Sequence, residues 1–219
     1  MTFIPIDRIV SLGNDGIYTS TNSANSAIIN LFNDTVSQVA VEVTNPHPSW
    51  PSLDNFGEDD NPSIEFRDTT NPRYIWNKSK AQPGDTVYFA AASTPMAATN
   101  IIDLFVCITA FADDAFEVNQ ISLCRVTDSG DLIEIEIEDL LSTPLQDGPM
   151  TLPVSDLESP PGWQTVRYFS NIYRRGGLSP NPNHYSLVVI FKAVNYPAPA
   201  NPDDNPGAIA FNIDIYKLT

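Results

Sequence analysis

An alternating run of isoleucine and glutamate near the middle of the chain is the feature that most constrains its fold. Ile133, Ile135 and Ile137 are each followed by a glutamate. Successive side chains of a β-strand point to opposite faces of a sheet. The run therefore predicts a strand with one buried face and one solvated face.

A second hydrophobic segment, 120–126, leads into this strand through a turn at Ser129 and Gly130. Glycine adopts positive φ without steric cost, so a tight hairpin is expected here. The expected cross-strand neighbours are Val126 with Ile133, Cys124 with Ile135, Ser122 with Ile137, and Arg125 with Glu134. The last pair joins opposite charges on the outer face.

A third hydrophobic segment, 101–111, precedes these two. Folding the chain at the centre of residues 112–119 sets Cys107 opposite Cys124, on the face that carries the isoleucines. The sequence thus predicts a three-stranded meander in one register. Both cysteines are expected to be buried thiols of the same interior rather than a disulfide.

Further strands are predicted along most of the chain, and no long helix is predicted. The expected strands are 3–12, 17–21, 36–43, 63–67, 73–77, 86–89, 185–194 and 208–216, and 163–173 is interpreted as extended. The 19 prolines stand mainly between hydrophobic runs, which suits short strands joined by ordered loops. We expect an all-β protein: an antiparallel two-sheet β-sandwich, jelly-roll-like, with long Pro-rich loops and one domain over residues 1–219.

The charge balance excludes several classes of partner. The chain has 27 acidic and 11 basic residues, a net charge of −16. Nucleic acids and anionic membrane surfaces need a cationic face, so neither is an expected partner. An acidic surface favours solubility, cation binding or a dense deposit that depends on pH.

Targeting signals do not stand out in the sequence. The first ten residues lack the apolar core of a signal peptide. No apolar run reaches the roughly 18 residues of a membrane helix. We expect a cytoplasmic protein without membrane insertion; export without a cleaved signal is the alternative.

A stiff loop over residues 45–61 carries the first candidate binding residues. It contains three prolines together with Trp50 and Phe56, and Trp163 lies in a second Pro-rich stretch. These rings either plug the end of the sandwich or stack on the apolar face of a sugar. Trp50, Phe56 and Trp163 are therefore the candidate ligand-binding residues.

The tetrapeptide Asp-Asp-Asn-Pro occurs twice and supplies the candidate metal ligands. The copies contain Asp59 and Asp60, and Asp203 and Asp204. Clustered carboxylate and amide oxygens suit calcium, although neither copy has EF-hand spacing and Asx-Pro also begins ordinary turns. Calcium is the one cofactor weighed; otherwise none is expected.

Catalytic motifs are not evident in the chain. The two histidines, His47 and His184, lie far apart and form no zinc pattern with the cysteines. The sequence contains neither a nucleophile elbow, a zinc-protease motif nor a phosphate-binding glycine loop. We therefore expect a protein that is not an enzyme.

Several short segments resemble the bacterial inclusion-body protein family of the PixA/AidA type. They are 84–89, 103–111, Arg175-Gly176, 185–191 and 211–216. The resemblance covers the C-terminal two thirds of the chain and leaves the first 70 residues unmatched. It implies a cytoplasmic β-sandwich that accumulates in inclusions and takes part in host interaction, and it carries over no catalytic residues.

Three hypotheses for function follow. The first is a structural or self-associating β-sandwich of inclusion-body or assembly type, hence a homo-oligomer. The second is a carbohydrate-binding, lectin-like module, assisted by calcium, whose partner is a glycan. The third is a viral coat-type jelly roll, which Pro-rich loops on a β-sandwich also suit.

Overall fold

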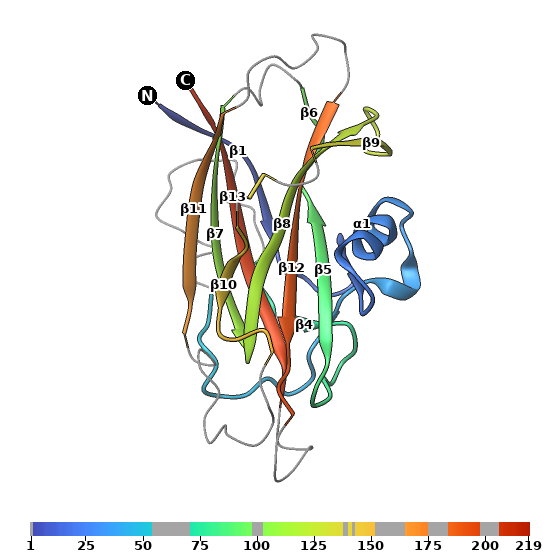
Figure 1. Ribbon diagram of the computed structural model, residues 1–219, viewed down its shortest axis with the longest axis vertical. Helices are drawn as coiled ribbons and strands as arrows, with labels where there is room; N and C mark the ends of the chain where they lie inside the picture. The colour runs from blue at the N-terminus through green and yellow to red at the C-terminus, as the bar shows by residue number, and fades with distance from the viewer. Residues whose placement is uncertain are drawn as a thin grey trace.

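Two antiparallel β-sheets pack against each other in the computed structural model (Figure 1), which confirms the predicted two-sheet sandwich. The structure describes residues 2–53, 71–97, 103–137, 140–141, 143–151, 165–174, 184–197 and 206–219. None of the helical segments within these ranges has the length and apolar character that a membrane span needs.

The first sheet contains the N-terminal and C-terminal strands. Its order is β11 (Arg167–Arg174), β7 (Asp103–Asp113), β13 (Ala208–Leu218), β4 (Ile75–Trp76) and β3 (Val41–Glu42), and β1 (Phe3–Val10) also pairs with β13. Beyond β1 and β13, the backbones of Thr2 and Thr219 exchange hydrogen bonds of 2.8 and 3.1 Å. Farther along the same pair, the Arg8 guanidinium donates to both carboxylate oxygens of Asp214 at 2.5 and 2.9 Å. The two ends of the chain therefore lie side by side (Figure 1).

The second sheet carries a helix on its outer face. Its order is β10 (Leu145–Asp147), β8 (Ala115–Val126), β12 (His184–Val194), β5 (Thr86–Ala92) and β2 (Ile17–Ser20). β6 (Met96–Ala97) pairs with β12, and β9 (Leu132–Ile137) pairs with β8. The helix α1 (Ala24–Phe32) lies over β5 and β12 (Figure 1), and a 3₁₀ turn, η1 (Val36–Gln38), follows it.

Aromatic side chains fill the space between the sheets. Phe191 of β12 stacks on Phe211 of β13 with ring centroids 4.4 Å apart, and Phe116 of β8 lies 6.3 Å from Phe191. All three are fully buried. Because they come from both sheets, their contacts hold the two layers together.

A two-stranded ribbon passes from one sheet to the other at one end of the sandwich. β7 ends at Asp113 in the first sheet and β8 begins at Ala115 in the second. The strands β12 and β13 make the reverse passage beside them, with Val194 opposite Ala115 and Ala208 opposite Asp113. β7 thus pairs with β13 in the first sheet, and β8 pairs with β12 in the second.

This passage shows that the predicted meander is wrong. β7 and β8 are not neighbours but belong to different sheets, and most residues of the expected connection 112–119 are strand residues. β7 is buried along both faces, so its hydrophobic pattern does not distinguish a hairpin partner from a strand in the opposite layer.

The two cysteines consequently do not share an interior, contrary to the prediction. Residues 104, 106 and 108 of β7 face the second sheet, which leaves Cys107 on the outer face of the first. Cys124 packs on the outer face of the second sheet with Ile28 of α1. Both are buried free thiols.

The predicted hairpin is present, and two of its four predicted cross-strand pairs are confirmed. Cys124 pairs with Ile135, and Arg125 pairs with Glu134 through an ion pair of 3.2 Å. Bulges at both ends shift the remaining pairs, so that Val126 opposes Leu132 and Leu123 opposes Ile137. Ile133, expected in the core, is exposed as a result.

The stretch between β2 and β3 differs most from its prediction. Residues 24–32 form a helix because Ser23 caps its first turn, its side chain accepting from the Ser26 backbone N–H at 3.1 Å. The strand expected over 36–43 is wrong except at its end: Val36 begins a 3₁₀ turn, and strand pairing starts only near Val41. The predicted strand 63–67 lies outside the described residues.

We expect Phe211→Ala to lower the free energy of unfolding by about 3–5 kcal/mol, because it opens a cavity where the sheets meet. Val36→Ala, at an exposed valine, should change it by less than about 0.5 kcal/mol. Urea unfolding followed by circular dichroism measures both. A small loss at Phe211 would contradict the assigned core.

Candidate functional site

Two adjacent buried carboxyl groups occupy the point where the ribbon passes between the sheets. Asp113 and Asp114 are 5% and 1% exposed, although they stand next to apolar core residues on both sides. Asp113 is the last residue of β7, and Asp114 links it to the first residue of β8. Burying carboxyl groups is costly unless they find hydrogen-bond partners.

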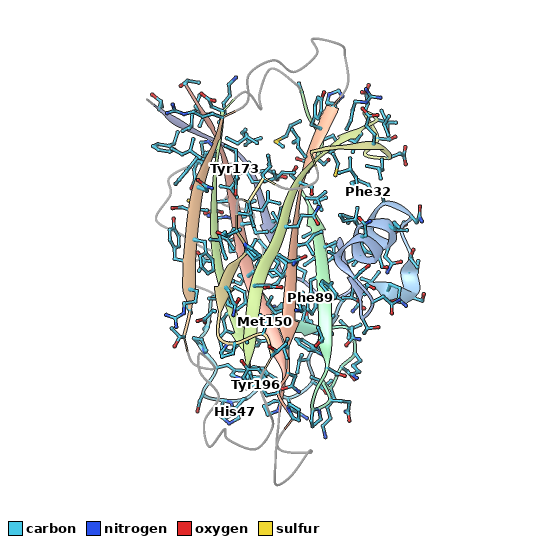
Figure 2. The ribbon with its side chains drawn as sticks, viewed as in Figure 1. Phe32, His47, Phe89, Met150, Tyr173 and Tyr196 are labelled. Atoms are coloured by element: carbon cyan, nitrogen blue, oxygen red, sulfur yellow. The ribbon has the colours of Figure 1, made fainter. Side chains whose placement is uncertain are left out.

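Each carboxyl group is bound to a different loop. The Trp50 indole Nε1 donates to Asp113 Oδ2 at 2.7 Å, and the Tyr196 backbone N–H donates to Asp114 Oδ2 at 2.6 Å. The Tyr196 hydroxyl in turn donates to the carbonyl of Pro149. His47, Tyr196 and Met150 mark these loops at the lower end of the sandwich in Figure 2.

Burial governs the electrostatics of the pair. It raises the pKa of Asp114 to about 9, and the hydrogen bond and negative charge of Asp113 act in the same direction. Burial also raises the pKa of Asp113, against the hydrogen bonds from Asp114 and Trp50 and the charge of His47. At neutral pH the pair therefore retains a proton on Asp114.

A protonated carboxyl group beside a second carboxyl group resembles the acid–base pairs of some hydrolases. Such chemistry needs access for a substrate, and these side chains are almost fully buried. Two surface cavities, one beside Glu42 and Arg73 and one beside Asp7 and Asp15, do not have Asp113 or Asp114 in their lining. The arrangement fits a group that holds loops in place better than one that meets a substrate.

Trp50 serves as a plug in this structure. It is 6% exposed, and its ring lies 5.0 Å from that of Tyr74 and 5.9 Å from that of Phe111, measured between centroids. Of the two roles considered for Trp50, this packing matches closure of the sandwich end. A sugar could not stack on the ring without displacing these neighbours.

A small cavity lies beside this aromatic cluster. Its volume is about 230 Å³, and its lining includes the polar side chains of Glu42, Ser52 and Arg73 and the ring of Tyr74. Glu42 and Arg73 are exposed, so the cavity opens to solvent. It offers a carboxylate, a guanidinium and an aromatic group to a small polar ligand.

The other predicted site residues lie outside the described ranges. These are Phe56, Asp59, Asp60, Trp163, Asp203 and Asp204. Within the ranges that the structure describes, no three His, Cys, Asp or Glu side chains come close enough to hold a metal ion. The calcium hypothesis rests on the Asp-Asp-Asn-Pro loops and stays a prediction.

A second candidate feature is the edge strand β11. It pairs with β7 along its whole length, and among the described residues it has no strand on its other side (Figure 1). Tyr168 and Ile172 on its outer face are 61% and 37% exposed. The Arg167 side chain forms an ion pair of 2.7 Å with Asp147 of β10, which links the two sheets at this edge.

Sequence reasoning did not single out either feature. Asp113-Asp114 is visible as two acids inside a long apolar stretch, but the predicted meander places it in the connection between two strands. Residues 163–173 fitted both a helix and a strand, and the extended interpretation is confirmed over 167–173. For the buried carboxyl pair, the available signal in the sequence was two adjacent acids within an otherwise apolar run.

We expect Trp50→Phe to destabilise the protein by about 1–3 kcal/mol, because a buried carboxyl oxygen loses its indole donor. Tyr74→Phe is the matched control: it removes a hydroxyl that donates to the Pro51 carbonyl at 2.9 Å, and should cost about 0.5–1.5 kcal/mol. Urea unfolding followed by circular dichroism compares them. A Trp50 variant more stable than the control would contradict the role given to this hydrogen bond.

Comparison of the chain with protein-family models, with curated proteins and with solved structures found no match.

Proposed function

We propose that this protein is a non-enzymatic, self-associating β-sandwich whose copies pair through strand β11. The observation that carries the proposal is an eight-residue edge strand with Tyr168 and Ile172 exposed on its outer face. An edge strand presents unpaired backbone N–H and C=O groups, which another strand can satisfy.

The other sheet edges among the described residues are protected in ways that β11 is not. β3, β10 and β2 are only 2, 3 and 4 residues long. β1 matches β11 in length but contains a proline, and β9 carries glutamates within its span, whereas the two arginines of β11 stand at its ends. Short strands, prolines and charges are the usual protection of edges. β11 has no proline and no acidic residue.

A second copy of the chain is the partner that fits this strand. β11 carries two arginines and no acidic residue, so the strand itself adds no negative charge to the contact between two copies of net charge −16. Antiparallel pairing about a two-fold axis at Ser170 sets Tyr168 beside the partner's Ile172, and the same contact recurs on the other side. Each such aromatic and β-branched pair contributes roughly 0.2–1 kcal/mol.

The net charge makes this association dependent on conditions. Two copies of charge −16 repel each other at neutral pH, and salt screens that repulsion. Lowering the pH toward the isoelectric point of about 4.1 removes the charge itself. Association is therefore expected to strengthen with salt and with mild acid.

The proposal predicts that Ile172→Lys weakens self-association roughly tenfold, because two apolar cross-strand contacts are replaced by two additional charges. Sedimentation velocity over a concentration series, at low and at moderate salt, measures the change. Ile133→Lys, at an exposed isoleucine of β9, should associate like the wild type. A wild-type chain that stays monomeric at high concentration and moderate salt would refute the proposal, as would equal effects of the two lysines.

The cavity beside Trp50 favours a second candidate, and we propose it as a carbohydrate site. Glu42 and Arg73 can exchange hydrogen bonds with hydroxyl groups, and Tyr74 offers an aromatic surface to a sugar ring. The volume of about 230 Å³ suits a single ring rather than a chain of sugars.

For this candidate we expect a glycan array to show binding that Arg73→Ala weakens at least tenfold. Lys80→Ala changes an exposed cation that does not line the cavity and should leave binding unchanged. The array is read with and without calcium, which separates the cavity from the Asp-Asp-Asn-Pro loops. An array that shows no glycan binding, with or without calcium, would refute the proposed carbohydrate site.

A further inference from the structure

We propose that the Asp113–Asp114 corner is a pH-sensitive latch, which holds three loops against one end of the sandwich and releases them when the carboxyl pair loses its shared proton. The inference does not depend on self-association. It concerns the end of the sandwich where the ribbon passes between the sheets.

The latch connects loops that are distant in sequence. Asp113 binds the loop of residues 45–53 through Trp50, and Asp114 binds residues 195–197 through the Tyr196 backbone. The Tyr196 hydroxyl extends the connection to Pro149. All three segments thus depend on two adjacent side chains of one corner.

The third loop is pressed closely against the corner. A Cβ atom placed on Gly148 would lie 2.9 Å from the Cβ of Ala115, the first residue of β8. Gly148 also has a φ of +76°, which favours glycine. The 148–151 segment therefore passes so close to the corner that only glycine fits at position 148.

A single proton satisfies the pair. Protonated Asp114 can donate to Asp113 while its other oxygen accepts from Tyr196, and Asp113 can accept from both Asp114 and Trp50. Asp114 Oδ1 accepts no hydrogen bond from the described groups, so this oxygen is the one available to carry the proton. Loss of the proton leaves two adjacent anions in a buried place, and opening to water is the way to relieve them.

The charged groups around the pair do not replace the proton. His47, on the loop bound by Asp113, lowers the pKa of that carboxyl group, but burial outweighs this effect and the net shift is upward. Arg167 of β11 is already bound to Asp147 of β10. Burial, and then the charges of Asp114 and Asp147, raise the pKa of the Tyr196 phenol, so this group also stays neutral as the carboxyl pair ionises.

The direction of the pH effect follows from the raised pKa values. Asp114 has a pKa of about 9 in the folded protein against 3.8 as its ordinary value. In that interval the folded state holds more protons than the unfolded state, so this group's contribution to stability is complete at low pH and declines as the pH rises. Each pH unit in the window lowers the folding equilibrium by up to about tenfold for this group.

Trp50 reports directly on the latch in the full-length chain. We expect its fluorescence emission to shift to longer wavelength, reversibly, as the pH is raised from 6 to 10. Trp50→Phe identifies the part of the spectrum that comes from this residue. Hydrogen exchange of the segments 45–53, 148–151 and 195–197 should accelerate over the same pH range, while β12 and β13 stay protected.

Asp114→Asn tests the assignment of the proton. Its amide can donate to Asp113 and accept from Tyr196 without any charge, so the transition should disappear. Asp15→Asn, at an exposed aspartate, should behave like the wild type. If Asp114→Asn does not fold, Asp113→Asn provides the second test: its amide donates to an ionised Asp114 and no second anion stands beside it, so the transition should weaken or disappear.

Three outcomes would overturn the proposal. The first is a wild-type chain without a transition between pH 6 and 10. The second is the wild-type transition unchanged in Asp114→Asn, or in Asp113→Asn. The third is simultaneous loss of protection in β7, β12 and β13, which would mean general unfolding rather than release of the loops.

Discussion

The double passage of the chain between the two sheets is the constraint on which the rest of this structure depends. β7 continues into β8 through Asp114, and the strands that pair with them, β13 and β12, likewise lie in opposite sheets, so the pairing is kept in both layers. This arrangement fixes which strands occupy the centre of each sheet. It also brings Phe191 and Phe211 face to face, because they lie on either side of the second passage. Shorter strands are then added at the edges.

Local sequence patterns predicted the parts of the fold that depend on neighbouring residues. The hairpin of β8 and β9 and the alternation of β13 follow from side chains a few residues apart, and both are found in the structure. The pairing of β7 depends on residues about a hundred positions away, and β7 is buried on both faces. A strand of this kind carries no alternation that would identify its neighbours, so the meander could not be distinguished from a passage between layers.

The candidate site illustrates the same limit at the level of single residues. Trp50 was noticed because a large aromatic ring in a Pro-rich loop is conspicuous in any sequence. Its orientation toward Phe111, and hence its role in closing the sandwich, could be known only from the packing. Asp113 and Asp114 were two acids among 27 in the sequence and became distinctive only through their burial. The helix α1 was missed because its nine residues are short for a periodic signal, although Ser23 marks its start.

The side-by-side position of residues 2 and 219 has a mechanical consequence. A stretching force applied between these two residues would load the hydrogen bonds of β1 and β13 one after another rather than all together, since the strands are antiparallel and both pulled ends lie at the same end of the pair. Peeling of this kind resists weakly. It would meet its first strong obstacle at the bidentate contact of Arg8 with Asp214, several residues into the pair. Under this force β1 should therefore separate from β13 first, while the two sheets stay packed around Phe191 and Phe211.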